Sequence, residues 1–304
     1  MIVVAGEALI DLAPRDGLLL PLPGGSPYNV SVGLGRLGCQ AAFLGPLSRD
    51  GFGQMLAERL AAEGANLDLA PRTDEPTTLA VVHLDDQARA SYGFYLDGTS
   101  APGLTKEQTS ILPPDAALHV SFGAVTLETP TAGPALLDLL VSERDVRLTS
   151  LDPNVRPSVI ADLPAYAGHM DALVADVGLV KVSDEDLHLL HPDTAPLEVA
   201  RRWASSGPAL VVVTLGPDGG IALRADGSDV EIAGEPVEVL DTVGAGDAFT
   251  SGLLAWLADH GHLSRDALRQ LSDDALGAAL RQAVQVAAIT CTRAGSDPPR
   301  RAER

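Results

Sequence analysis

One glycine-rich stretch constrains the fold of this chain more than any other, and it runs from Asp241 to Phe249 as Asp-Thr-Val-Gly-Ala-Gly-Asp-Ala-Phe. The apolar run Val237–Leu240 before it is typical of a strand end, while apolar residues recur at helical spacing after it. A helix is therefore predicted to begin near Gly244. Glycines at such a junction let a ligand approach the backbone closely, and the free amides and dipole of the first helical turn favour an anion such as phosphate.

Asp247 is unusual because it puts a carboxylate into a pocket suited to anions. In a site that only binds phosphate, this carboxylate would repel the ligand. It can act as a base if a hydroxyl lies between the carboxylate and the phosphorus. The carboxylate then accepts the hydroxyl proton as phosphorus is attacked. The alternative is an acid that only complements the helix dipole, and short motifs match by chance often enough to keep it open.

The composition limits the classes of protein to which this chain can belong. With 304 residues, 46% of them hydrophobic, it can bury a large core, as one α/β domain or two smaller ones. A formal net charge of −20 argues against nucleic acid or an anionic membrane as a partner. Two cysteines, Cys39 and Cys291, are too few for a disulfide framework, and neither a signal peptide nor a membrane-spanning run is recognised. We therefore expect a cytoplasmic protein.

Short apolar runs alternate with helical patterns along most of the chain, which predicts a mostly parallel sheet between helices. The runs predicted as its strands are Ile2–Ala5, Ala41–Leu44, His119–Phe122, Arg147–Asp152, Gly178–Val182 and Leu210–Thr214, with an antiparallel ending at Ile221–Leu223 and Val230–Ile232. The last helix is predicted over residues 274–291, and the tail 296–301 is expected to fray. Without an internal repeat or linker, residues 1–304 are predicted to form a single α/β domain.

A small second sheet is predicted from segments inserted into this alternation. Leu18–Pro23 reads as a short strand, and Thr77–Leu84 with Arg89–Tyr95 reads as an antiparallel hairpin around residues 85–87. The inserted segments, approximately 12–25 and 74–100, are predicted to form a lid that excludes water from the site.

Polar residues near the start of the chain are candidates for ligand contacts. Asp11 is expected in a loop just past the first strand, at the edge where open parallel sheets bind ligands. Ser26 is predicted to be a helix N-cap with Pro27 in the first helical position. Asn29 would then lie in the first turn beside the pair Gly24-Gly25, able to hydrogen-bond a polar ligand.

Two other kinds of site are excluded by context. Gly33-x-Gly35-x-x-Gly38 matches the dinucleotide-binding fingerprint, but it closes a helix instead of following a strand and opening one. These glycines are interpreted as allowing that helix to pack closely on the sheet. The seven histidines lack metal-ligand spacing near carboxylates, and the Gly-x-Ser-x-Gly of serine hydrolases is absent.

In their order along the chain, these motifs resemble those of the ribokinase-like (PfkB) family of sugar kinases, over nearly the whole length. Gly24-Gly25-x-x-x-Asn29 with the three glycines after it is similar to the amino-terminal signature, and the stretch 241–249 to the carboxyl-terminal one. Thr214-x-Gly216-x-x-Gly219 is similar to the nucleotide-side motif. The resemblance implies a three-layer α/β/α domain with a mostly parallel central sheet and a small β-sheet lid.

The resemblance also implies roles, position by position. Asp247 would take the proton of a sugar hydroxyl, and the amides of Gly244, Ala245 and Gly246 would form an anion hole. Because its place at a helix terminus favours the ionised form, Asp247 is expected to be a weak base. Asp11, Gly25 and Asn29 would hold sugar hydroxyls, Gly24 and Asn154 would also line the sugar site, and Arg156 would reach the substrate or the moving phosphate. Phe94 or Tyr95 would pack on the sugar from the lid, although these aromatics are equally well explained as the core of the lid. The ATP site would be lined by Lys181, Ser183, Thr214, Gly216, Gly219 and Gly246.

Family members use ATP with Mg²⁺, and many respond to K⁺. The family's N-x-x-E pattern is replaced here by Ser183 and Asp186, so Asp186 is the carboxylate expected to serve magnesium, with a shorter reach. Potassium would lie near Asp241 and the loop Arg293–Ser296.

The runs Asp152–Arg156 and Lys181–Glu185 resemble the fructokinase and 2-keto-3-deoxygluconate kinase branch of the family, and relatives in that branch often carry arginine where Leu96 stands. A substrate carboxylate would need a cation, so fructose is expected first. The alternatives are a 2-keto-3-deoxygluconate kinase, a ribokinase or nucleoside kinase, and a sugar-sensing protein without catalysis. A homodimer through the lid is expected from the apolar residues of Thr77–Val82.

Overall fold

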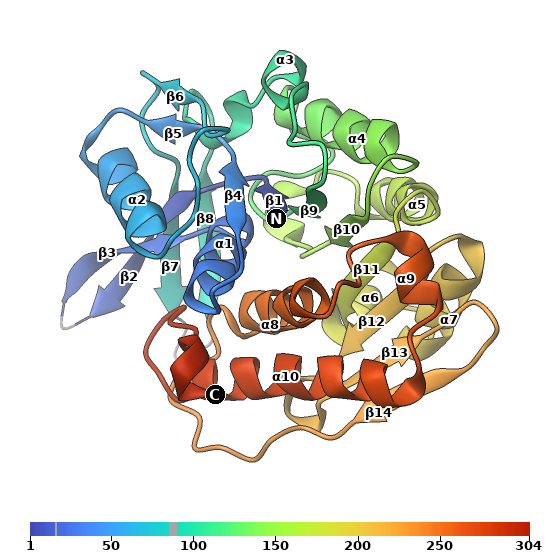
Figure 1. Cartoon of the computed structure of the whole chain (residues 1–304). Coiled ribbons are helices and arrows are strands. Elements are labelled where there is room, and N and C mark those ends of the chain that lie inside the picture. The colour runs from blue at the N-terminus through green and yellow to red at the C-terminus, as the bar shows by residue number, and fades with distance from the viewer. Residues whose placement is uncertain (16, 85–89) are drawn as a thin grey trace.

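The central sheet of this computed structural model has eight strands among the residues it describes, which are 1–15, 17–84 and 90–304 (Figure 1). From one edge to the other they are β14 (Asp229–Ile232), β13 (Gly220–Leu223), β12 (Leu210–Thr214), β11 (Leu179–Ser183), β10 (Thr149–Asp152), β9 (Ala117–Ser121), β1 (Ile2–Ala5) and β4 (Ala41–Leu44). Neighbours from β12 to β4 pair in parallel, whereas β13 and β14 are antiparallel. The predicted mostly parallel sheet with an antiparallel ending is confirmed.

Helices cover both faces of this sheet because its strands are apolar on both sides. In β1, Ile2 and Val4 pack into one cluster, while Val3 and Ala5 pack into another. The first cluster includes residues of α1 (Ser26–Arg36), α8 (Ala245–Asp259) and α10 (Asp273–Cys291). The second includes residues of α4 (Ala132–Glu143), α5 (Leu163–Val174), α6 (Asp184–Leu190) and α7 (Pro196–Ser206). The three-layer α/β/α arrangement is thereby confirmed.

The remaining elements are short or peripheral. They include α2 (Gly51–Ala62), α3 (Lys106–Thr109), α9 (Arg265–Arg269) and a two-stranded parallel sheet of β5 (Leu47–Ser48) and β6 (Arg72–Thr73). Within the described ranges, no helix combines the length and the apolar character that crossing a membrane requires.

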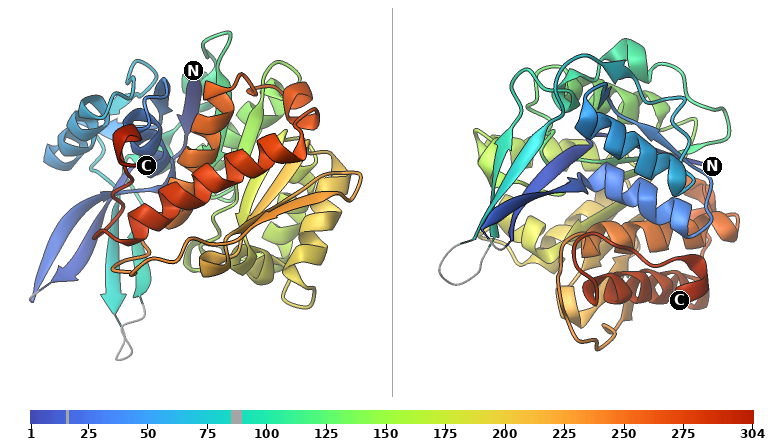
Figure 2. Two further views of the ribbon diagram at one scale, coloured as in Figure 1. Left: turned by 60° about the horizontal axis from the view of Figure 1, so that its bottom comes forward. Right: turned by 90° about the vertical axis from the view of Figure 1, so that its left-hand side faces the viewer.

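A separate four-stranded sheet projects from one end of the body, as Figure 2 shows. Its order is β3 (Leu18–Gly24), β2 (Leu9–Arg15), β7 (Leu79–Leu84) and β8 (Ala90–Tyr95). β7 and β8 form the predicted antiparallel hairpin, and the turn predicted at 85–87 lies outside the described residues. The placement of Asp11 in a loop was wrong, because Asp11 lies inside β2, where it pairs with Leu22 of β3 and Ala80 of β7. We call this small sheet the lid.

The first turn of α1 differs from its prediction. The N-cap is Gly25, with φ of 99°, and Ser26 already belongs to the helix with its side chain buried. The glycines at 33 and 35 serve contacts between helices and not the sheet. A Cβ on Gly33 would overlap Ser251 of α8, and one on Gly35 would overlap the Glu63 carbonyl oxygen at the end of α2.

Two predictions about the second half of the chain were wrong. Val237–Leu240 is not a strand: β14 ends at Ile232, and the side chain of Leu240 is exposed while its amide donates to the Cys291 carbonyl oxygen. Its alternating pattern found no neighbouring strand to pair with. The tail does not fray, because Arg36 of α1 binds Asp297 and Arg301 donates to the Leu37 carbonyl oxygen at 2.6 Å.

Candidate active site

Polar residues meet where the parallel strands end. The register places Asp152 of β10 beside Ser121 of β9, and Ser183 of β11 beside Thr214 of β12. Each of these residues is the last of its strand, so their side chains lie along one edge of the sheet. The first turns of α1 and α8 approach the same edge, since Ser26 contacts both Ser121 and Asp247. Ligand sites in open parallel sheets form at such an edge.

The glycine-rich junction at the start of α8 is closely packed. Gly244 is the N-cap, with φ of 76°, and a Cβ there would overlap the Ser296 side chain. A Cβ on Gly246 would lie 3.1 Å from Lys181 Nζ, so the ammonium faces the backbone of this turn. The Ala245 amide donates to the Thr242 carbonyl oxygen at 3.2 Å. The ammonium of Lys181 and the first turn of α8 therefore lie together, with the Ala245 amide engaged by the turn itself.

The carboxylate of Asp247 is held by both oxygens. Ser26 Oγ donates to Oδ1 at 2.6 Å, and Asn29 Nδ2 donates to Oδ2 at 2.8 Å. Burial raises the pKa of Asp247, against these two hydrogen bonds and the charge of Lys181, which lower it. The expectation of a weak base considered only the helix terminus, and burial makes Asp247 a stronger base than that position alone implies.

A buried ion pair lies directly behind the junction. Lys181 Nζ is 3.0 Å from Asp152 Oδ2, and both side chains are buried. Burial lowers the pKa of Lys181, but the charges of Asp152, Asp186 and Asp247 outweigh it and keep the pKa above its usual value. Lys181 therefore stays protonated and lies beside Gly246.

Glu7 is a site residue that sequence reasoning missed. It follows β1 and is buried, and its oxygens accept the backbone N–H groups of Ala124 and Val125 at 3.0 and 3.1 Å. Burial raises the pKa of Glu7 to about 7. The available signal was a carboxylate immediately after a buried apolar strand, the same signal that had drawn attention to Asp11.

Asp11 and Arg156 complete a charged group with Glu7. Burial raises the pKa of Asp11 to about 6, while the charge of Arg156 lowers the pKa of both acids. Arg156 itself is half-buried, and its Nη1 donates to the Val155 carbonyl oxygen. A Cβ on Gly24 would overlap Asp11 Oδ2, which explains why the small residue is required there. The structure thus brings the predicted Asp11, Gly24 and Arg156 together.

Other predicted sugar-side residues have partners within the protein. Asn154 has φ of 40°, and its Nδ2 donates to the Phe122 carbonyl oxygen at 2.9 Å. Phe94 stacks on Tyr92 with ring centroids 6.0 Å apart, and both pack on a small apolar cluster of the lid. The buried members of that cluster are Leu9, Ala80 and Ala124, and Leu96 is partly buried against it.

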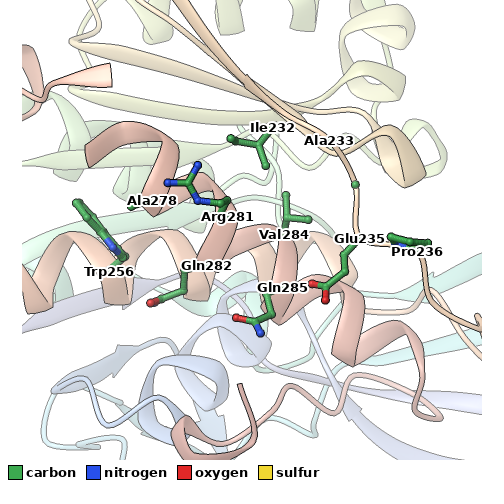
Figure 3. Close-up of a pocket in the computed structure, with 11 residues that line it drawn as sticks. Ile232, Ala233, Glu235, Pro236, Trp256, Ala278, Arg281, Gln282, Val284 and Gln285 are labelled. Carbon is green, nitrogen blue, oxygen red and sulfur yellow. The ribbon is translucent and has the colours of Figure 1, made fainter. Parts of the chain in front are cut away.

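The predicted nucleotide-side residues lie at the ends of β11 and β12. Ser183 Oγ caps α6 by accepting the Asp186 amide at 3.0 Å, and Asp186 Oδ1 accepts the Val155 amide at 3.0 Å. Gly216 and Gly219 have φ of 55° and 100°, and a Cβ on Gly219 would overlap the backbone of residues 232–234. Those residues form one wall of a groove of about 630 Å³, and α8 and α10 form the other (Figure 3).

Asp241 ties together two loops in front of α8. Its Oδ1 accepts the Val243 amide at 3.0 Å, and its Oδ2 accepts the Gly295 amide at 2.7 Å. This carboxylate therefore adjoins the 293–296 loop, as predicted from the sequence. Among the described residues, no three His, Cys, Asp or Glu side chains are grouped to hold a metal ion.

Known proteins resemble this chain in both sequence and fold. A fructokinase from Rhizobium leguminosarum bv. trifolii is 37% identical over 282 residues, which cover 91% of this chain and 85% of the relative. A fructokinase from Xylella fastidiosa, solved with bound ATP, has a TM-score of 0.86 at 26% identity, covering 97% of this chain and 93% of its own. A fructokinase from Vibrio cholerae O395, solved with fructose, ADP and calcium ion, has a TM-score of 0.83 at 26% identity, covering 97% and 94%. The model of the pfkB family of carbohydrate kinases matches residues 2–302, and this chain therefore belongs to that family of phosphotransferases, which act on an alcohol group.

Proposed function

We propose that this protein transfers the γ-phosphoryl group of ATP to a hydroxyl of a neutral sugar, with fructose first. One observation carries the proposal: a carboxylate with a raised pKa, that of Asp247, stands in the first turn of α8 beside glycine amides and a buried ammonium. A base beside an anion site suits a reaction in which a hydroxyl attacks an anionic group. Similarity to fructokinases over most of the chain supports the choice of fructose.

In the proposed reaction, Asp247 takes the proton of the attacking hydroxyl. The sugar oxygen forms a bond to the γ-phosphorus as the bond from that phosphorus to the bridging oxygen breaks, and ADP leaves. The amides of Gly244 and Gly246 would stabilise the charge on the transferred group, and that of Ala245 would join them once it leaves the Thr242 carbonyl oxygen. Lys181, expected on the ATP side, lies beside Gly246, and we assign its ammonium to the transferred phosphoryl group.

The sugar would bind between the lid and the sheet edge. Asp11, Gly24, Gly25, Asn29, Asn154 and Arg156 are the proposed contacts to its hydroxyls, and Phe94 with Tyr92 forms the apolar side. Two features favour a neutral sugar. Leu96 belongs to the apolar cluster of the lid and offers no charge. Arg156 already faces the carboxyls of Glu7 and Asp11, so its charge is not free for a substrate carboxylate.

The nucleotide would lie on the other side of Asp247. Ser183 and Thr214 end the neighbouring strands β11 and β12, and Gly216 and Gly219 follow β12. Gly219 packs against the wall of the groove formed by residues 232–236. Figure 3 shows apolar side chains of this groove, among them Val284 of α10 and Pro236. Its size and its mixture of apolar side chains with polar ones, among them Gln282 and Gln285, suit a planar base with polar edges. We propose that adenine occupies the groove and the triphosphate extends towards Gly244.

Metal ions would enter with the nucleotide. Magnesium commonly binds through phosphates, waters and one or two carboxylates, so a site without a dedicated cluster suits it, and Asp186 is the proposed carboxylate. When bound, it would neutralise charge on the phosphates. For potassium, Asp241 and the 293–296 loop offer oxygen ligands beside Gly244, and Asp241 already holds that loop in place.

The lid is the proposed contact between two copies of the chain. Leu18 and Leu22 of β3 are 66% and 41% exposed, while Thr77 and Ala80, within the segment first suggested for this contact, are buried. Apolar side chains exposed along an edge strand favour association with another sheet. We also retain the cytoplasm as the proposed compartment, consistent with two free cysteine thiols.

A coupled ADP-release assay tests the function. With Mg-ATP, we expect the highest kcat/KM for fructose in a panel with ribose, 2-keto-3-deoxygluconate, adenosine and no sugar. Asp247→Asn should abolish turnover while sugar binding persists, because the amide keeps the shape but accepts no proton. A higher kcat/KM for the keto-deoxy acid or for ribose would replace fructose as the proposed substrate. If the protein binds a sugar but phosphorylates none of the panel, it would be a sensing protein. Full activity of Asp247→Asn would overturn the mechanism.

A further inference from the structure

Two residues in the first turn of α1 hydrogen-bond the Asp247 carboxylate, although they are far from it in sequence. Ser26 reaches Oδ1 and Asn29 reaches Oδ2 over sequence separations of 221 and 218 residues. Asn29 is one of the proposed sugar contacts, whereas Ser26 is buried and was expected only to cap its own helix. We propose that Ser26 is a positioning residue that sets the orientation and the basicity of the Asp247 carboxylate, an inference that rests on the proposed role of Asp247 as base.

A second hydroxyl determines the direction in which Ser26 donates. Ser121 Oγ lies 2.5 Å from Ser26 Oγ, at the end of β9, and Ser121 is fully buried. A hydroxyl has one proton, so Ser26 can donate to Asp247 only while it accepts from Ser121. The competing acceptor of Ser121, the Phe122 carbonyl oxygen, is farther away at 3.2 Å. Both protons therefore point towards the carboxylate, which stabilises its ionised form.

Ser26 has a large influence on the pKa of Asp247. Burial raises the pKa of Asp247, and among the influences that lower it the hydrogen bond from Ser26 is the largest, ahead of Asn29 and Lys181. Charged groups from several elements also face this carboxylate, and they are Glu7, Asp11, Asp152 and Lys181. Three of these are acids, so losing the donor from Ser26 would leave Asp247 among like charges.

The pH dependence of kcat separates a positioning role from a purely structural one. In Ser26→Ala we expect the acid limb of the profile to move to higher pH by about one unit, the loss of one charge-assisted hydrogen bond. On the alkaline side kcat should approach that of the native protein. Ser26→Thr keeps the hydroxyl and should restore the native limb, while Ser121→Ala should move the limb less, in the same direction. Ser31→Ala removes another buried hydroxyl of α1, one that donates to the Pro27 carbonyl oxygen at 2.9 Å, and should leave the limb in place.

Two results would overturn the assignment. One is a uniform loss of kcat at every pH in Ser26→Ala, which indicates a folding contact only, and the other is an unmoved acid limb. If the native protein phosphorylates no sugar, the proposed function fails, and a carboxyl ¹³C titration by NMR still decides the role of Ser26. The Asp247 signal is identified by its loss in Asp247→Asn. Its midpoint should be higher in Ser26→Ala, and equal midpoints would refute the inference.

Discussion

Replacing Lys181 with methionine perturbs the stability and the chemistry of the site together. Lys181 Nζ lies 3.0 Å from Asp152 Oδ2, and the two side chains are only 6% and 2% exposed to solvent. Removing one partner of such a pair leaves an unpaired buried charge, which costs about 3–5 kcal/mol. Asp186 and Asp247 also face the ammonium, so we expect Lys181→Met to fall near the upper end of this range.

The second step of this experiment removes the orphaned charge. Asp152→Asn in the Lys181→Met background should regain most of the lost free energy of unfolding, because no unpaired carboxylate remains at that position. Arg201→Met is the matched control, since Arg201 pairs with Asp229 at 3.2 Å on the surface, with side chains 49% and 38% exposed. It should cost less than about 1 kcal/mol. Urea unfolding of the four proteins measures each value.

Turnover then distinguishes the two roles of Lys181. In the double variant we expect kcat to stay at least about 100-fold below the native value although stability has returned, because the cation beside Gly246 is still absent. A Lys181→Met protein as stable as the native one would refute the reasoning from the buried pair. A double variant with native kcat would refute the contact between Lys181 and the transferred phosphoryl group.

Three further outcomes are expected. Gly219→Ala should lower stability and raise the KM for ATP more than Gly227→Ala, because Gly227 has a similar φ of 86° but its Cβ would meet no atom within 4 Å; equal losses in urea would contradict this. Burial raises the pKa of Glu7 from 4.5 to about 7, so the folded protein retains a proton that the unfolded chain releases, and stability falls as pH rises through this window. Glu7→Gln should remove most of that fall, about 3 kcal/mol, in unfolding curves recorded from about pH 4 to about pH 8, and curves parallel to those of the native protein would refute the assignment. Leu18→Ser combined with Leu22→Ser should weaken self-association in analytical ultracentrifugation, and a native protein that is monomeric at every concentration would remove the proposed lid interface.

The regular elements could be predicted because their signals are local. The strands over 2–5, 41–44 and 210–214 have the predicted bounds, since each is a continuous apolar run closed by a polar or glycine residue. The glycine-rich start of α8 was predicted for the same reason, as its amides and turn geometry belong to adjacent residues. Local pattern therefore accounts for the layers, the lid and the position of Asp247.

Contacts between distant segments were not predictable in this way. Ser26 has the local features of an N-cap, yet its hydroxyl binds a carboxylate from the other end of the chain. Glu7 gave no sign of its burial, which depends on Ala124 and Val125 folding over it. The alternating apolar pattern of Val237–Leu240 is typical of a strand. A strand also needs a neighbouring strand to pair with, and the pattern of one segment does not show whether that neighbour exists.

The long sequence separation between Ser26 and Asp247 affects the order in which parts of the molecule fold and become active. The groups proposed to hold the sugar all come from residues 11–156, whereas the proposed base belongs to α8. Closing such a long loop is slow. A folding intermediate without docked α8 would bind sugar weakly and transfer no phosphoryl group. In a refolding experiment, kinase activity should therefore appear after helical circular dichroism has returned, and activity becomes a direct measure of the last docking step.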